Sequence, residues 1–330
     1  MKVLALAAVA PLALLLTTAA APADAPPKLA LPVACTPGKT CEIQHYVDRD
    51  PGPGTRDYRC GLETYQGHDG VDIRVPDLAA QRRGVAVLAA APGKVLRVRD
   101  EMPDISITAP GAPPVPNDRM CGNGMVIDHG GGWMTQYCHL ARGSVSVKAG
   151  DAVAAGTPIG RVGMSGGAEF PHLHFKVIHG TQVVDPFAPD MSHPESCAAQ
   201  AGLWTTKAAA AMPYHAGAIL NAGFTDAVPT MQMVEEAAVP PAGAGAAALV
   251  VYVRSIGLMP GDIVDLTLTG PGGLTVHSAK PPLANWRAQD LFAIGKKRPA
   301  GGWPTGVYAA DYKVLRQGKA ALSRHLELRL

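Results

Sequence analysis

Between residues 85 and 180 the chain consists of short apolar runs separated by turns that contain glycine. The runs are VAVLAA, GKVLRVRD, GMVIDHG, GWMTQYCHL, SVSVKAGDAV, TPIGRVG and HLHFKVIHG. Turns at a spacing of roughly 8 to 12 residues are typical of all-β domains and do not fit an alternation of strands and helices. The pattern therefore predicts a mainly β, antiparallel domain, interrupted by a long proline-rich surface loop at residues 102–117.

A second region of strand-like alternation follows residue 214. Runs such as ALVVYVRSIG, GDIVDLTLTGPGG and GVYAADYKVLRQGK lie between proline and glycine turns, which suits a small antiparallel β-sandwich. We expect a first domain over residues 26–197, an alanine-rich linker over 198–214 and an accessory β-sandwich-like domain over 215–330. The accessory domain contains no cysteine and no obvious catalytic cluster, so a binding module and a structural cover for the first domain both fit it.

Residues 1–25 have the pattern of a secretory signal peptide. Lys2 precedes an apolar core from Val3 to about Leu16, and small residues that offer A-x-A cleavage sites follow. A membrane anchor is the alternative, but Pro11 and a core shorter than the roughly 20 residues of a spanning helix argue against it. The sequence thus predicts an exported protein, periplasmic or secreted, with no membrane span after signal cleavage.

Composition and charge narrow the range of partners. Hydrophobic residues make up 47% of the chain and charged residues 17%, which is typical of a folded globular protein and excludes an intrinsically disordered one. The formal net charge is +2 and no run of basic residues occurs, so we expect no nucleic-acid partner. The oligomeric state is left open by the sequence.

All six cysteines lie after the signal peptide and before residue 200. An even number of cysteines in an exported protein favours disulfides over free thiols, so we expect three bridges in the first domain. Sequence alone does not choose among the pairings, and proximity suggests only that Cys35 joins Cys41.

Two histidines lie two residues apart in the apolar run FPHLHFKV at residues 170–177. Successive side chains of a strand point to opposite faces, so His172 and His174 share one face while Leu173 and Phe175 share the other. The ordinary interpretation of such a pair is two half-exposed histidines on an edge strand. Polar residues elsewhere in the first domain favour a functional interpretation.

The upstream segment GHDGVDIRVP contains His68 and Asp72. A helix would place both on one face, but Gly70, the β-branched residues that follow it and Pro76 argue against a helix here. A fully extended chain would hold the two residues too far apart to bind one ion. The Asp69-Gly70 pair resolves this, because Asp-Gly favours a tight turn that folds His68 back toward Asp72.

A further histidine, His139, ends the run GWMTQYCHL. Strict alternation places Tyr137 on its face and Cys138 on the opposite one, so Cys138 is expected to be a disulfide partner rather than a metal ligand. Histidine and aspartate are zinc ligands, and two imidazoles with one carboxylate leave the fourth tetrahedral position open for water. The remaining imidazoles would serve in proton transfer and charge stabilisation.

Four segments surround these residues with a common glycine-rich framework: GHDGVDIRVP, GNGMVIDHGGGWMTQYCHL, VKAGDAVAAGTPIGRVGMSGGAEFPHLHFKV and VVDPF. In this order they resemble the motifs of the lysostaphin/LytM-type zinc metallopeptidases, which cut peptide bridges in bacterial peptidoglycan. The resemblance covers roughly residues 60–190. It implies a small antiparallel β-sheet groove as the fold and one zinc ion per chain.

The resemblance also implies a role for each candidate residue. His68 and Asp72 of the HxxxD motif and His174, the second histidine of the HxH motif, would bind zinc. His172, the first histidine of that motif, and His139 would be the unliganded catalytic histidines.

Two tyrosines and one lysine complete the set of candidates. Tyr65 and Tyr137 are candidate donors to the oxyanion of the reaction, although a structural role is the ordinary interpretation of each. Lys176 stands where many relatives have an acidic residue, and the loop at 102–117 is longer than usual. Both differences bear on substrate preference more than on catalysis.

The sequence therefore predicts an exported zinc-dependent endopeptidase that hydrolyses peptide cross-links of bacterial peptidoglycan, with zinc-bound water as the nucleophile. One alternative is a catalytically silent relative that binds the cell wall and regulates it. Another is a zinc protease that acts on other glycine-rich proteins. Silent relatives typically lack one or more metal ligands, and this chain has all five expected residues, which favours an active enzyme.

Overall fold

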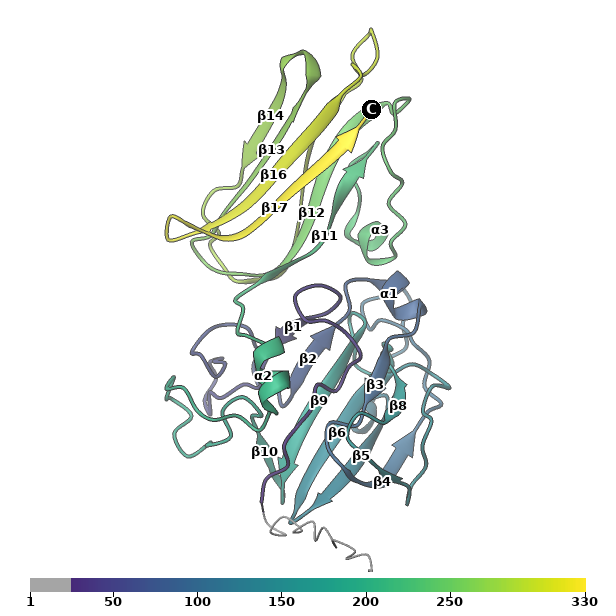
Figure 1. Cartoon of the computed structure of the whole chain (residues 1–330), viewed down its shortest axis with the longest axis vertical. Coiled ribbons are helices and arrows are strands. Elements are labelled where there is room, and N and C mark those ends of the chain that lie inside the picture. The colour runs from purple at the N-terminus through teal and green to yellow at the C-terminus, as the bar shows by residue number, and fades with distance from the viewer. Residues whose placement is uncertain (1–24) are drawn as a thin grey trace, which may run out of the picture.

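The computed structural model describes residues 25–330, so residues 1–24, nearly all of the expected signal peptide, lie outside the described residues. Two bodies are visible in Figure 1, one that contains β1 to β10 and one that contains β11 to β17. We call them the N-terminal body and the C-terminal body. Each encloses its own cluster of buried apolar side chains, and the mainly β architecture predicted from the sequence is confirmed.

The N-terminal body is built on one eight-stranded antiparallel sheet. Its strands follow the order β1-β2-β9-β6-β5-β4-β7, and β10 pairs with β9. The strands are β1 (Glu42–His45), β2 (Val71–Arg74), β4 (Gly93–Arg99), β5 (Asn123–Gly130), β6 (Trp133–Leu140), β7 (Ala152–Val153), β9 (His172–His179) and β10 (Gln182–Val184). A two-stranded sheet of β3 (Ala86–Leu88) and β8 (Pro158–Arg161) lies beside it, together with α1 (Leu78–Arg82), α2 (Thr206–Ala211) and the 3₁₀ turn η1 (Asn117–Arg119).

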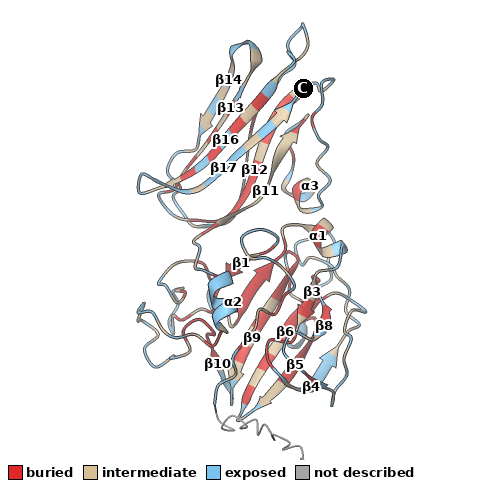
Figure 2. Cartoon of the chain, viewed as in Figure 1, coloured by how far each residue is buried: buried red, intermediate tan, exposed pale blue. Residues whose placement is uncertain are grey.

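The centre of this sheet shows the alternation expected for β9. Leu173 and Phe175 are fully buried in the apolar core, and Figure 2 shows the buried stretches of β9, β6 and β5 side by side. His174 pairs with Asp72 of β2 across the ladder. The predicted division of β9 into an apolar face and an imidazole face is therefore confirmed, and the imidazole face also carries residues of β2.

The two segments expected to lack strands differ in their packing. Residues 102–117 contain no helix or strand before the start of η1, apart from a bridge between Asp104 and Ser165, in agreement with the predicted loop. In the alanine-rich segment α2 forms, and Leu203, Trp204, Ala208 and Met212 are buried in the core of the N-terminal body. This segment therefore covers the first core on its way to the second body.

The C-terminal body is a sandwich of two antiparallel sheets, ordered β11-β12-β15 and β14-β13-β16-β17. Apolar side chains from both sheets, such as Val251 and Leu266, are fully buried in the core of this body, as expected for a β-sandwich. The elements are β11 (Ala218–Thr225), α3 (Met231–Glu235), β12 (Ala248–Leu258), β13 (Ile263–Gly270), the 3₁₀ turn η2 (Pro271–Gly273), β14 (Leu274–Ala279), β15 (Arg287–Lys297), β16 (Val307–Arg316) and β17 (Lys319–Arg329).

Three disulfides lie in the N-terminal body, as the even cysteine count predicted. Cys35 joins Cys41, which agrees with the expectation from proximity. The other two bridges are Cys60–Cys197 and Cys121–Cys138. Across residues 25–330 no helix combines the length and the apolar character that crossing a membrane requires.

A buried ionic network joins the two bodies. Arg254 of β12 and Arg74 of β2 are both fully buried and share one oxygen of Glu235 on α3, at 2.6 and 3.3 Å. Arg254 also donates to the main-chain oxygen of Pro76 at 2.6 Å, and Figure 1 shows α3 facing α1 across this joint. Breaking a buried ion pair leaves an uncompensated charge that costs about 3–5 kcal/mol, so the network favours one docked arrangement.

Glu63 is a buried carboxyl group at the joint, and its titration contributes to the pH dependence of stability. It is 2% exposed, and a Cβ built on Gly257 of β12 would lie 2.5 Å from its Oε1 atom. Burial, together with nearby Asp57 and Asp262, raises the pKa of Glu63 from 4.5 to about 8, while Arg316 opposes this rise. Because its folded-state pKa is raised, the contribution of Glu63 to stability is fully present below pH 4.5 and is lost as pH rises through about 8.

We therefore expect Glu63→Gln to remove most of this pH dependence. Wild-type protein should lose on the order of 3 kcal/mol of unfolding free energy between pH 4.5 and 8 through this group. Urea unfolding at several pH values measures the loss in both proteins, with the exposed Glu169→Gln as the matched control. Equal pH slopes for wild type and Glu63→Gln would contradict the assignment.

Candidate metal centre and active site

Three side chains meet at one point on the imidazole face of the sheet. His68, Asp72 and His174 each offer one ligand atom, and these atoms lie within 4.8 Å of one another. His68 Nε2 and His174 Nδ1 are 3.2 Å apart and lie 3.2 and 3.0 Å from Asp72 Oδ1. Ligands about 2.0–2.1 Å from a tetrahedral zinc ion are separated by about 3.3 Å, so the three atoms have the spacing of a zinc site.

The local chain path explains how His68 reaches Asp72. The tight turn lies at Gln66 and Gly67, ahead of His68, and the chain only bends at Gly70 before β2 begins at Val71, so the expected Asp69-Gly70 turn is wrong although His68 and Asp72 do converge. Gly70 also passes close to His174, because a Cβ built on it would lie 2.5 Å from His174 Nε2. A larger residue at position 70 would push the ring of His174 out of the cluster.

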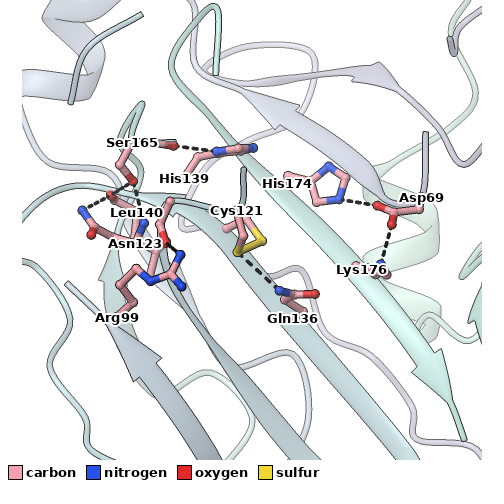
Figure 3. Close-up of a disulfide and its surroundings, with 12 residues drawn as sticks. Asp69, Arg99, Cys121, Asn123, Gln136, His139, Leu140, Ser165, His174 and Lys176 are labelled. Carbon is pink, nitrogen blue, oxygen red and sulfur yellow. Dashed lines mark hydrogen bonds and ion pairs between the residues drawn. A yellow bond between two sulfur atoms is a disulfide. The ribbon is translucent and has the colours of Figure 1, made fainter. Parts of the chain in front are cut away.

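The two ligand histidines are each held by a hydrogen bond on the nitrogen that faces away from the cluster. His68 Nδ1 donates to the main-chain oxygen of Tyr46 at 2.7 Å. His174 Nε2 donates to Asp69 Oδ1 at 3.1 Å, and Asp69 in turn pairs with Lys176, as Figure 3 shows. Such outer partners fix the ring orientation and leave the inner nitrogen free to bind a metal.

The two carboxylate oxygens of Asp72 likewise have different partners. Oδ1 faces the cluster, whereas Oδ2 accepts a hydrogen bond from His45 Nδ1 at 2.9 Å. Burial would raise the pKa of Asp72, but the charges of His68 and His172 and the hydrogen bonds of His174 and His45 hold this pKa well below its usual range. The Asp72 carboxylate is therefore anionic throughout the neutral pH range.

His174 carries a proton that a metal would replace. Burial lowers its pKa, but the hydrogen bonds and charges of Asp69 and Asp72 outweigh burial and raise the pKa to about 9. A metal ion binds the deprotonated imidazole and competes with this proton. The centre thus attracts a positive charge at the point where the three ligand atoms meet.

His139 and His172 lie beside this cluster with their rings 4.6 Å apart. His139 Nδ1 donates to the main-chain oxygen of Ser165 at 2.7 Å, and His172 Nδ1 donates to that of Phe170 at 2.8 Å. Both Nε2 atoms therefore keep their lone pairs. Burial lowers the pKa of His139 well below its usual value and that of His172 to about 4, so both rings are neutral near pH 7.

The structure corrects the alternation expected around His139. His139 has a backbone φ of +62°, and the register between β5 and β6 shifts nearby. Tyr137 stays in regular register opposite Phe175 and so faces the apolar core, where its hydroxyl accepts from the main-chain nitrogen of Ala90 at 2.8 Å and contacts Thr135. The expectation that Tyr137 shares the face of His139 is wrong, and its hydroxyl is not available to an oxyanion.

The disulfide at Cys138 holds this irregular strand end in place. Cys138 pairs with Cys121, as the sequence predicted for it in preference to metal binding. The main-chain oxygen of Cys121 also accepts from the nitrogen of His139 at 2.8 Å, and Figure 3 shows the disulfide close to His139. Ser165 is fixed as well, since its hydroxyl donates to the main-chain oxygen of Leu140 at 2.7 Å.

Tyr65 is the remaining tyrosine candidate. Its ring lies 4.5 Å from that of His68, and the residue is 48% exposed. Burial of the phenol and the nearby carboxylates of Asp72 and Asp69 raise its pKa above the usual value, so the hydroxyl stays protonated. Tyr65 therefore presents a hydrogen-bond donor next to the cluster, in contrast to Tyr137.

Three contributors to the centre were not found from the sequence. Asp69 was recognised only as a turn residue, and the main-chain oxygen of Tyr46 has no sequence signal. His45 lies at the end of β1 in EIQH, far from every motif. The only available hint for Asp69 was its charge next to His68, together with Lys176 two residues after His174 on the same face of β9.

Comparison with known proteins places this geometry in a family. Residues 66–186 match peptidase family M23. This segment is an M23 peptidase domain. The M23 domain includes all five residues singled out above, His68, Asp72, His139, His172 and His174, whereas His45 and Tyr65 precede it.

Two curated proteins align with part of the chain. The cell division protein DipM of Caulobacter vibrioides is 31% identical over 126 residues, which cover 38% of this chain and 17% of DipM. The peptidoglycan DD-endopeptidase ShyA of Vibrio cholerae is 42% identical over 62 residues, 19% of this chain and 14% of ShyA. The aligned part thus spans less than a quarter of the length of either relative.

A solved structure is also similar to the chain. The catalytic domain of the prophage-encoded M23 protein EnpA from Enterococcus faecalis aligns with 20% sequence identity and a TM-score of 0.31. The alignment covers 52% of this chain and 95% of that domain.

Proposed function

We propose that this chain is an exported, zinc-dependent endopeptidase that hydrolyses peptide cross-links of bacterial peptidoglycan. The observation on which the proposal rests is the convergence of His68 Nε2, Asp72 Oδ1 and His174 Nδ1 within 3.2 Å of one another. Membership of the M23 domain in a peptidase family and the name of the relative ShyA support the reaction and the substrate.

In this proposal His68, Asp72 and His174 hold one zinc ion, and the fourth position stays open. Bound zinc polarises the scissile carbonyl and lowers the pKa of the attacking water to about 7. Asp72 supplies the one negative charge of the ligand set. Asp69 and the main chain at Tyr46 hold His174 and His68 in orientation through their outer hydrogen bonds.

His139 and His172 are the proposed proton-transfer residues. Each ring donates its Nδ1 proton to a main-chain oxygen and keeps a free Nε2 lone pair, which is the form that a general base requires. One Nε2 takes the proton released by water and passes it to the leaving amine. The other ring would stabilise the oxyanion as the imidazolium, after its Nε2 takes up a proton from solvent, and Tyr65 can add a second donor.

The three disulfides and the signal-like first 25 residues support export, since disulfides persist in oxidising compartments. Peptidoglycan lies in the same compartments, so an exported chain would meet this substrate in the periplasm or outside the cell. No nucleic-acid partner is proposed.

Digestion of purified peptidoglycan by the mature protein tests the function. We expect new amine ends and cross-link fragments, identified by mass spectrometry, which disappear when a chelator removes zinc and return when zinc is added back. A protein that binds peptidoglycan but releases no fragments with zinc present would instead be a silent wall-binding relative. Cleavage of a glycine-rich protein with peptidoglycan left intact would instead favour a zinc protease that acts on other glycine-rich proteins.

A further inference from the structure

His45 is the one histidine in contact with the metal cluster to which the proposed function gives no chemical step. It is 6% exposed, and its Nδ1 donates to Asp72 Oδ2 at 2.9 Å. We propose that His45 is a positioning residue for Asp72, and that Trp286 of the C-terminal body keeps His45 in place. The second body then contributes to metal affinity, an inference that rests on the proposed zinc site.

The sheet is distorted at the position that brings His45 to Asp72. Along β1, Ile43 pairs with Ile73, and the next pair is His45 with Asp72, so the register shifts by one residue. Without this bulge, Gln44 would stand opposite Asp72. Bulges of this kind redirect a side chain next to an active site at the expense of local pairing.

A hydrogen bond on Oδ2 matters because a carboxylate rotates easily about its last bond. Asp72 Oδ1 lies 3.0–3.5 Å from ring nitrogens of His68, His174 and His172, and a half-turn about the Cβ–Cγ bond would exchange the two oxygens in the cluster. His45 holds Oδ2 on the far side and fixes Oδ1 as the ligand. Loss of such an outer partner typically weakens metal binding by about 10–100-fold.

His45 is enclosed by aromatic rings from both bodies. The ring of Tyr65 lies 5.2 Å away, and those of Phe170 and Trp286 each lie 6.2 Å away. Trp286 directly precedes β15 and so belongs to the C-terminal body. It is the contact through which the sandwich reaches the metal cluster.

Trp286 acts through packing in this arrangement. Its Nε1 atom is buried and has no hydrogen-bond partner among the described residues. A phenylalanine at this position should therefore replace most of its effect, whereas alanine should not. The network of Arg74, Glu235 and Arg254 holds the body that carries Trp286 against the sheet.

Zinc affinity of the full-length mature protein, measured by competition with a chromophoric chelator, tests the inference without an activity assay. We expect His45→Ala to weaken zinc binding about 10–100-fold. His45→Asn should restore most of the affinity, because the asparagine Nδ2 occupies the place of the histidine Nδ1. Trp286→Ala should weaken binding by a smaller factor, and Trp286→Phe should bind like wild type.

Trp303→Ala is the matched control, since Trp303 packs in the sandwich core and donates to Ala246. It should leave zinc affinity unchanged even if it lowers stability, and urea unfolding of each metal-free variant separates the two effects.

Wild-type affinity in folded His45→Ala would overturn the inference while leaving the proposed function intact. Zinc affinity equal to that of wild type in Trp286→Ala would show that the C-terminal body does not contribute to metal binding. Absence of zinc binding by the wild-type protein would instead overturn the proposed function.

Discussion

Replacing His174 with alanine is expected to abolish zinc binding and peptidoglycan hydrolysis together. The variant loses one of the three proposed ligand atoms. It also loses the hydrogen bond of 3.1 Å between His174 Nε2 and Asp69 Oδ1. Two remaining ligands, His68 and Asp72, cannot hold zinc in a tetrahedral site with one open position. Metal analysis of the dialysed protein and a digestion assay measure the two losses, which should leave less than about a hundredth of wild-type activity.

His179 provides the matched control because it lies at the exposed end of the same strand, stacked on Trp133. His179→Ala should keep both zinc and activity. If His174→Ala instead retained one zinc per chain with wild-type affinity, the proposed ligand set would be wrong.

Replacing His139 with asparagine is expected to give the opposite pattern, full zinc content with turnover lowered roughly 100- to 10,000-fold, the range typical of a general acid-base residue. Asparagine tolerates the left-handed backbone at φ +62° better than alanine does. Its Nδ2 can also donate to the Ser165 oxygen that accepts from His139. The variant therefore removes the Nε2 atom while preserving the fold around it.

Kinetics with a soluble cross-linked peptide, together with metal analysis, check this expectation. His129→Asn is the control, because His129 contacts Pro92 and Thr135 rather than the cluster. Wild-type turnover in His139→Asn would exclude His139 from proton transfer, and loss of zinc from this variant would assign it to the ligand set instead.

Regular periodicity accounts for the parts of the fold that the sequence predicted. The alternation in HLHFKVIH places Leu173 and Phe175 in the core and the two histidines on the opposite face, as observed. The expected convergence of His68 and Asp72 is also observed, although the tight turn lies at residues 66–67 and not at Asp69-Gly70. These predictions succeed because each depends on a few neighbouring residues whose backbone preferences agree with the tertiary structure.

The irregular positions could not be predicted, and they lie next to the centre. His139 departs from strand alternation through its positive φ and joins the imidazole face, while Tyr137 stays opposite Phe175 on the core face. His45 reaches Asp72 through a register shift in β1. Neither position carries a glycine, the usual local signal for such a distortion, and the Cys121–Cys138 disulfide adjoins the one at His139.

The contact between the two bodies could not be predicted from the sequence either. Glu235, Arg74 and Arg254 are separated by many residues and belong to three different elements. Only the folded arrangement places Trp286 near His45. The sequence therefore predicted a second β domain, but it did not predict that this domain contacts His45 beside the candidate metal centre.

X-ray absorption spectroscopy of the purified mature protein loaded with zinc tests the central claim most directly. The account predicts one zinc per chain with two imidazole nitrogens, one carboxylate oxygen and a solvent oxygen, all at about 2.0–2.2 Å. The spectrum of His174→Ala should lose this signature. A zinc ion with four protein ligands in the wild-type protein, or the same spectrum after removal of His174, would contradict the account.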